Sequence, residues 1–436
     1  MLRLLLHNLE KKNGMAQKIE RRIWQGVWGY KEAFVACIGL IAVGVFLQLS
    51  IGGVGNTIFS YPFNVVFGGF YLVILVVLQL AAGKRTIVRW MGSSPTAITL
   101  MLMLGFTVLL MGVTPQRNLY EAPQGGVVSR IGLDAILHTW YFAFIFFFLL
   151  TSLGLITVKR LIPFHKKNIG FVLNHLGLWL TLFAGVLGSG DMARLTMSLT
   201  EGKVEWRGQD RQGVIYEMPI ATELHDFAME EYAANLYLID TRTGDALPKE
   251  KPVHLALEDS LTKGDIEGWQ IEVVRKMDDA APVTADKYVR YINMGSCQAA
   301  YIKATSRDGR QKKEGWISSG SFMFPHKSLY LTDTLGLLMG VPEPKKFRSE
   351  VTIYSKNGVR VDTSIEVNRP VVVDGWTIYQ LGYDDKMGKW SNQSTIEMVK
   401  DPWLKVVYVG LLMVLAGAVY LFWIANKQKK ELSNVE

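Results

Sequence analysis

Seven histidines are the side chains in this chain best suited to chemistry, and one of them has an unusual setting. His175 lies in the apolar run 171–179, where an ionisable residue is costly and usually faces a partner or a cavity. A neutral imidazole at this place is a good axial ligand for haem iron. The alternative is that His175 only hydrogen-bonds a neighbouring helix, and the residues alone favour neither interpretation.

His138 is the second candidate ligand, in the sequence Leu137-His138-Thr139-Trp140 at the start of an apolar run. A histidine beside a tryptophan at a membrane interface is more often an anchor than a ligand. The other histidines are expected to be solvated or to satisfy the core: His7, His165, His225, His254 and His326.

Other chemistries lack the residues they need. The sequence contains no P-loop, hydrolase elbow or HExxH motif. The two cysteines, Cys37 and Cys297, cannot form a disulfide framework, and neither CxxC nor CxxCH is present. The chain therefore has no redox thiol pair and no covalent haem attachment site of its own.

Six apolar stretches of about 20 residues are predicted to be transmembrane helices, because that length crosses the hydrocarbon core of a bilayer. Two of these helices must position His138 and His175. The chain has 436 residues, of which 49% are hydrophobic, and the apolar blocks are concentrated before residue 190 and near the C-terminus. The predicted spans are 33–52, 63–82, 96–114, 136–157, 169–188 and 403–425.

Basic residues beside the spans set the predicted orientation. The net charge is +8, and it gathers next to the spans as the positive-inside rule requires, so no nucleic-acid partner is expected. The basic segments contain Lys11, Lys12, Lys18, Arg21 and Arg22; Lys84, Arg85 and Arg89; Lys159, Arg160, Lys166 and Lys167; and Lys427, Lys429 and Lys430. Both termini are expected in the cytoplasm of a bacterial cell, with the chain spanning its inner membrane.

The predicted organisation has five parts: a cytoplasmic segment 1–32, a five-helix transmembrane region 33–188, an extracytoplasmic β-rich domain 189–402, a final transmembrane helix 403–425 and a cytoplasmic tail 426–436. The expected fold class is thus a polytopic α-helical membrane protein with about six transmembrane helices and a large antiparallel β domain on the periplasmic side.

Turn signals and alternating residues predict the β structure of the middle region. Two β-branched runs flank Lys356-Asn357-Gly358, which is a strong hairpin signal. Asp308-Gly309 and Asp374-Gly375 mark further turns. An antiparallel sandwich or a barrel-like domain, tethered by a span at each end, is the expected form.

Five blocks follow one another in a distinctive order between residues 131 and 425, about two-thirds of the chain. They are His138-Thr139-Trp140-Tyr141-Phe142; 168–178 with Gly188-Ser189-Gly190-Asp191 and Arg194-Leu195; 366–370; 375–384; and Asp401-Pro402-Trp403 with Tyr408-Val409-Gly410. In these blocks and in its layout, the chain resembles the ResB family of cytochrome c biogenesis proteins, which belongs to the system II machinery for haem export and attachment.

The resemblance implies partners and a cargo. A ResB protein works with a CcsA-type membrane protein whose tryptophan-rich WWD segment holds haem, and together they join haem to the CxxCH thiols of apocytochrome c. No WWD-like segment is present here, so the resemblance implies that this chain is the ResB half of a haem lyase complex and that the catalytic surface lies on the partner. This half would supply an axial ligand to haem b in transit, best matched by His175, with His138 as the other candidate.

Two other functions compete with this one. The chain could be a non-catalytic membrane anchor or scaffold whose outer domain binds a partner protein. It could also be a transporter of another class, although it lacks the repeated halves that such folds often show.

Overall fold

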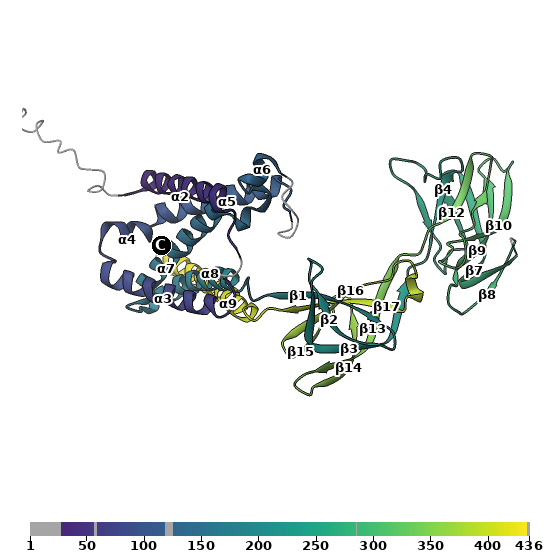
Figure 1. The fold of residues 1–436 in the computed structure, drawn as a ribbon. Coiled ribbons are helices and arrows are strands. Elements are labelled where there is room, and N and C mark those ends of the chain that lie inside the picture. The colour runs from purple at the N-terminus through teal and green to yellow at the C-terminus, as the bar shows by residue number, and fades with distance from the viewer. Residues whose placement is uncertain (1–27, 56–58, 118–124, 285, 434–436) are drawn as a thin grey trace, which may run out of the picture. The chain divides into compact units, whose positions relative to one another are not determined.

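The computed structural model describes residues 28–55, 59–117, 125–284 and 286–433, and the chain divides into two compact units. The helical unit comprises residues up to Met192 together with those from Asp401 onward, and the β unit runs from Ala193 to Lys400. His7 and most of the predicted segment 1–32 lie outside the described residues. Figure 1 shows the helices of the one unit and the strands of the other.

Among the residues that the structure describes, six helices of the helical unit are long and apolar enough to cross a membrane, as predicted for a polytopic α-helical membrane protein. These spans cover Tyr30–Ile51, Phe63–Ala82, Ser94–Val113, Gly126–Leu161, Lys166–Leu187 and Leu404–Ile424. The helices themselves are α2 Tyr30–Ile51, α3 Phe63–Ala82, α4 Thr86–Met91, α5 Ser94–Val113, α6 Gly126–Arg130, η3 Leu133–His138, α7 Trp140–Leu161, η4 Lys166–Asn168, α8 Ile169–Leu187 and α9 Leu404–Ser433.

The predicted span 136–157 is not a single helix, because the helical backbone is interrupted at Thr139. That residue has extended backbone angles, and its hydroxyl accepts a hydrogen bond from the Phe142 amide at 3.3 Å, which caps the first turn of α7. The short helix η3 therefore ends at His138, and α7 continues four residues beyond the predicted end at 157, to Leu161.

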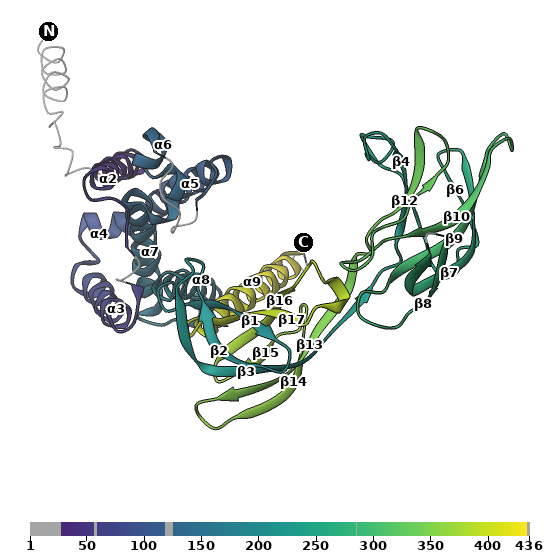
Figure 2. The ribbon, with the colours of Figure 1, turned by 45° about the vertical axis from the view of Figure 1, so that its right-hand side comes forward.

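Small residues allow the helices of this unit to approach closely. A Cβ on Gly44 of α2 would lie 2.4 Å from the Tyr141 Cα of α7, and a Cβ on Gly177 of α8 would lie 2.6 Å from the Gly410 carbonyl oxygen of α9. Neither site has room for a side chain, so backbone packs on backbone as is common between helices in lipid. Figure 2 shows α8 and α9 side by side.

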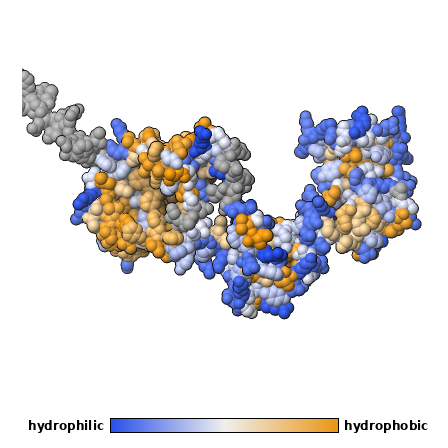
Figure 3. Space-filling model, viewed as in Figure 1, coloured by the Kyte–Doolittle hydropathy of each residue, from blue (hydrophilic) through white to orange (hydrophobic). Residues whose placement is uncertain are grey.

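The outer faces of these helices are strongly apolar. Large side chains such as Phe46, Phe70, Leu102 and Phe422 are more than half exposed. Figure 3 shows the corresponding hydrophobic surface over the helical unit. In water such a surface would be costly, whereas a lipid bilayer covers it at no penalty.

Eight antiparallel strands of the β unit form one curled sheet in the order β14-β13-β3-β2-β1-β17-β16-β15. The strands are β1 Ala193–Thr200, β2 Val204–Gln209, β3 Ile215–Glu231, β13 Pro344–Ser355, β14 Arg360–Glu366, β15 Val371–Val373, β16 Trp376–Tyr383 and β17 Gln393–Lys400. Side chains from both halves of the sheet meet inside: Ser349 of β13 bonds Gln380 of β16 at 2.8 Å and Ser394 of β17 at 2.7 Å. The sheet is therefore nearly a barrel.

Two smaller antiparallel sheets pack around a second core. The first contains β4 Asn235–Asp240, β5 His254–Ala256, β11 Leu329–Tyr330 and β12 Leu335–Met339; the other contains β6 Lys263–Ile266, β7 Trp269–Thr284, β8 Lys287–Arg290, β9 Cys297–Ser306 and β10 Lys312–Ser318. Leu236 and Leu337 from the first sheet pack with Ile302 from the second. This arrangement is a sandwich, so the β unit combines both predicted forms.

The predicted turns are confirmed. Lys356-Asn357-Gly358 joins β13 to β14, with Gly358 at a φ of 81°. Asp374-Gly375 joins β15 to β16, and both residues have positive φ, as a two-residue hairpin with the right-handed strand twist requires.

Candidate functional site

Helix α8 presents His175 at the edge of its packed surface. Trp179, one turn further on, is buried, and its indole Nε1 donates to the Leu150 carbonyl of α7 at 3.1 Å. The face that packs on α9 carries Gly177, on the opposite side of the helix from Trp179. Leu178, about 60° around the helix from His175, is 45% exposed. His175 is thus half-buried beside an open face of α8.

The contacts of His175 fix its hydrogen-bonding state. Its Nδ1 lies 3.0 Å from the Phe171 carbonyl oxygen, which can only accept, so Nδ1 carries the hydrogen. Its ring stacks on the Phe171 ring, with centroids 3.6 Å apart and planes at 16°. In the neutral imidazole Nε2 then holds a lone pair, and it has no hydrogen-bond partner within the described part of the chain.

This arrangement fits a metal-ligating histidine. A ligating imidazole normally donates its other ring N–H to a carbonyl or carboxylate, which fixes the tautomer and raises the basicity of the ligating nitrogen. The Phe171 carbonyl supplies that bond to His175. The Nε2 lone pair of His175 is therefore available to a metal, with the Phe171 ring beside it.

His138 lies far from His175. It ends η3, and its carbonyl accepts from the Val54 amide at 2.7 Å. The Trp179–Leu150 hydrogen bond sets the level of α8 against α7. Counting at 1.5 Å per residue from that level places the two histidines more than ~20 Å apart along the helix axes. They cannot ligate one iron atom together. The two predicted ligands therefore belong to two separate sites.

One polar node in the helical unit was not predicted. The Asp191 carboxylate accepts from the Tyr61 amide at 2.6 Å, from Asn64 Nδ2 at 2.6 Å and from Trp403 Nε1 at 2.7 Å. It thereby ties the start of α3 and the end of α8 to the start of α9. Burial raises the pKa of Asp191, but these three hydrogen bonds outweigh it, so the pKa lies below its ordinary value.

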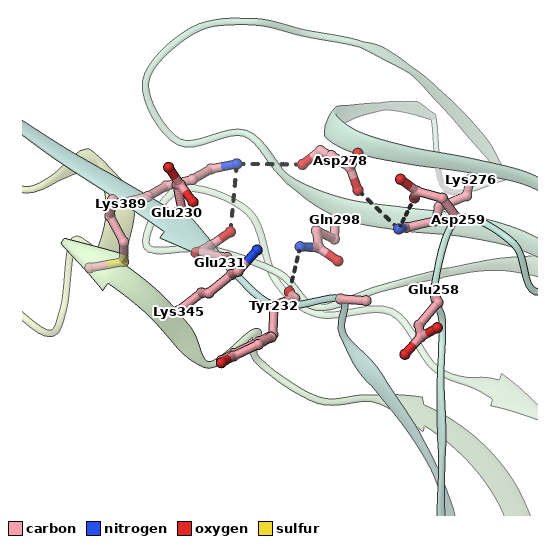
Figure 4. A pocket seen from close by; sticks show the side chains of 12 residues that line it. Glu230, Glu231, Tyr232, Glu258, Asp259, Lys276, Asp278, Gln298, Lys345 and Lys389 are labelled. Carbon is pink, nitrogen blue, oxygen red and sulfur yellow. Dashed lines mark hydrogen bonds and ion pairs between the residues drawn. The ribbon is translucent and has the colours of Figure 1, made fainter.

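A polar hollow of about 510 Å³ lies in the β unit, between β3, β7 and the turn that holds Lys389. Figure 4 shows its lining side chains pairing with one another. Lys389 Nζ lies 2.7 Å from Asp279 and 3.8 Å from Glu231, and Lys276 Nζ lies 2.7 Å from Asp259. Both lysines are paired with carboxylates, which is the pattern of a structural ion-pair network.

The pKa shifts in the hollow have the same origin. Burial is the main reason that the pKa of Glu231 is raised, with the nearby Asp279 charge adding to it and Lys389 opposing it. Burial would lower the pKa of Lys276, but Asp259 and Asp278 raise it above its ordinary value. Among the residues that the structure describes, no group of three or more histidine, cysteine, aspartate or glutamate side chains could hold a metal.

Two histidines of the β unit have ordinary structural contacts. His225 Nε2 lies 2.6 Å from the Thr352 hydroxyl, which in turn donates to Asp362 at 2.6 Å. The His254 ring packs against Tyr237 across neighbouring strands, with centroids 5.9 Å apart. Both histidines are therefore accounted for by neighbours within the β unit, whereas His175 keeps a free Nε2 and is the best-formed candidate site.

Comparison with known proteins gives one clear result. No curated protein matches this chain. The model of the ResB-like family matches residues 328–398, which run from β11 to β17 within the β unit and include the predicted blocks 366–370 and 375–384. The predicted resemblance to the ResB family is therefore confirmed in this segment, and it supports a role for this chain in cytochrome c biogenesis at the level of the family.

Proposed function

We propose that this chain is the ResB-like subunit of a system II cytochrome c synthase, which helps to carry haem across the membrane and attach it to the CxxCH motifs of apocytochrome c. The ResB-like match supports the pathway. The observation that carries the specific role is the oriented imidazole of His175, with Nδ1 bonded to Phe171 and Nε2 free beside an open helix face.

In this proposal haem is a substrate in transit. His175 would hold the iron from one side, and a CcsA-type membrane protein would supply the second axial ligand and the surface on which the thioether bonds form. Axial ligation protects the iron and sets its potential. Because His138 lies too far away to share that iron, it belongs to a different step or anchors η3 at the interface.

The proposed topology follows from the charges beside the spans. The last turn of α7 contains Lys159 and Arg160, and the connection to α8 contains Lys166 and Lys167, with no acidic residue in either. This favours the cytoplasmic side of a bacterial inner membrane. The β unit would then lie in the periplasm, where apocytochrome c is matured. Both ends of that unit return to the membrane together, because Ala193 pairs with Lys400 across β1 and β17.

The visible spectrum of the detergent-purified chain, alone and with a CcsA-type partner, tests the proposal. A b-type haem signal should be present in the wild type with its partner and should be lost in His175→Ala, while His138→Ala should keep the spectrum. Cytochrome c maturation in cells carrying each variant is measured in parallel. Normal maturation and a haem-free complex in every preparation would refute the ligand role.

A scaffold function is the second candidate. It is favoured by the compact β unit, which has its own two cores and contains the whole ResB-like match. If the β unit on one foreign transmembrane helix restores cytochrome c maturation, the spans serve only as an anchor. Loss of maturation in that chimera would contradict the scaffold function.

A further inference from the structure

Arg160 stands out among the basic residues at the α7–α8 connection because of what it contacts. Its guanidinium carbon lies 5.4 Å from the centroid of the Phe171 ring, above the ring plane. The same ring stacks on the His175 imidazole, at 3.6 Å between centroids. One phenyl ring therefore contacts both a guanidinium and the candidate iron ligand.

The charge of Arg160 is not neutralised within the described part of the chain. No ion pair involves Arg160, although its backbone carbonyl accepts from Asn168 Nδ2 at 3.1 Å. Acidic side chains described in the helical unit are few and bonded elsewhere: Glu32 to the Gly29 amide, Asp134 to Arg117, Asp191 to Trp403, and Asp401 to the Trp403 amide.

A guanidinium that lies beside a ring stack and has no anionic partner favours a carboxylate as its ligand. It presents five N–H donors in a rigid plane, which matches the two oxygens of a carboxylate. Arg160 is exposed, so its donors are accessible from the same end of α8 at which His175 lies. Positive-inside placement alone explains a positive charge here, but it does not explain why the guanidinium is held on the ring that orients His175.

We infer that Arg160 binds a carboxylate of the same amphipathic ligand whose metal is held by His175. This inference rests on the proposed haem-binding function and adds a recognition element to it. The flat macrocycle would lie along the open face of α8, with its iron at His175 Nε2 and a propionate at Arg160. Arg160 is then a positioning residue that selects the orientation in which the dianionic ligand enters at this end of the helix.

Carboxylate recognition by Arg160 can be distinguished from a packing role by comparing the binding of haem with that of its dimethyl ester, in which both carboxylates are blocked. The full-length protein with its CcsA-type partner, in nanodiscs of phosphatidylcholine, is titrated with each ligand and the Soret band gives the Kd. Arg160→Gln should weaken haem binding by about tenfold or more, since one charge-assisted hydrogen bond is lost, and should leave the Kd of the ester unchanged. Arg160→Lys should fall between the wild type and Arg160→Gln.

Arg89→Gln is the matched control, because Arg89 is also exposed and basic and lies on α4 rather than near His175. It should bind both ligands as the wild type does. Equal losses for haem and ester in Arg160→Gln would mean that Arg160 only supports packing, and no loss for either would mean that it contacts neither; both results overturn the inference while the proposed function stands.

Nanodiscs that contain phosphatidylglycerol test the competing anion, a lipid headgroup. If Arg160→Gln changes only the binding of that lipid and leaves the Kd of haem unaltered, Arg160 is a lipid site and the inference is wrong. If the wild-type complex binds neither haem nor ester, the proposed haem-binding function fails together with the inference, and the pattern differs from every outcome above.

Discussion

Asp191→Ala should loosen the helical unit and leave the β unit unchanged. The Asp191 carboxylate accepts from the Tyr61 amide, Asn64 Nδ2 and Trp403 Nε1, which lie 130, 127 and 212 residues away from it in the sequence. The side chain of Asn64 is fully buried, whereas Asp191 is half-buried. The substitution therefore removes three charge-assisted bonds at the point where α3, α8 and α9 begin or end.

The loss of unfolding free energy in Asp191→Ala depends on which hydrogen-bond acceptors each donor still has. Asn64 Nδ2 keeps the Leu187 carbonyl at 2.9 Å and the Phe59 carbonyl at 3.0 Å, so it is not orphaned. Trp403 Nε1 and the Tyr61 amide lose the carboxylate, but water can reach a half-buried site. A charge-assisted bond contributes ~1.5–3 kcal/mol, so we expect the free energy of unfolding of the helical unit to fall by about 2–4 kcal/mol.

Two buried free cysteines make the assay specific for each unit. Cys37 lies in α2 and Cys297 begins β9, so a thiol-reactive dye reports the unfolding of one unit when the other cysteine is replaced by serine. The assay measures the temperature at which each cysteine is half labelled. In Asp191→Ala this midpoint temperature should be lower for Cys37 and unchanged for Cys297. An unchanged Cys37 midpoint, or an equal fall in both, would refute the reasoning.

The stability that the Asp191 carboxylate contributes should depend on pH. The pKa of Asp191 in the folded protein lies below its ordinary value of 3.8, so the ionised form contributes stability. That contribution is complete above about pH 5 and is lost as the pH falls through the folded pKa. The difference in the Cys37 midpoint between wild type and Asp191→Asn should therefore be constant near neutral pH and narrow below about pH 4. A difference that widens in acid would contradict this sign.

Two further predictions use the same reporters. Gly177→Ala places a Cβ 2.6 Å from the Gly410 carbonyl and should destabilise the helical unit by roughly 1–3 kcal/mol, whereas Gly185→Ala, with no atom within 4 Å, should be neutral or stabilising; equal Cys37 midpoints in the two variants would exclude the packing argument. Lys389→Gln breaks the 2.7 Å pair with Asp279, which is partly exposed, and should lower the free energy of unfolding of the β unit by about 1–3 kcal/mol and with it the Cys297 midpoint temperature; an unchanged midpoint would show that solvent screens the pair.

The sequence by itself determined the spans and the hairpins. Both depend on local properties: about 20 apolar residues for a helix that crosses a bilayer, and glycine at positive φ for a tight turn, as at Gly358. It also directed attention to His175, because an ionisable residue within an apolar run is conspicuous without any knowledge of its neighbours.

The break at Thr139 was less predictable. Apolar residues continue on both sides of it, so hydropathy indicates one helix. The Thr139 hydroxyl caps α7, and the extended backbone there separates His138 from that helix. Threonine is a common capping residue, but its type alone does not show that a cap is used at this position.

Only the tertiary structure decided which residues act together. The sequence could not show that Arg160 and His175 share the ring of Phe171. Nor could it pair Asp191 with Trp403. The physical reason is that hydropathy and turn preferences are properties of short segments, whereas these contacts depend on how helices cross, and the crossing is fixed by where glycines let two backbones meet.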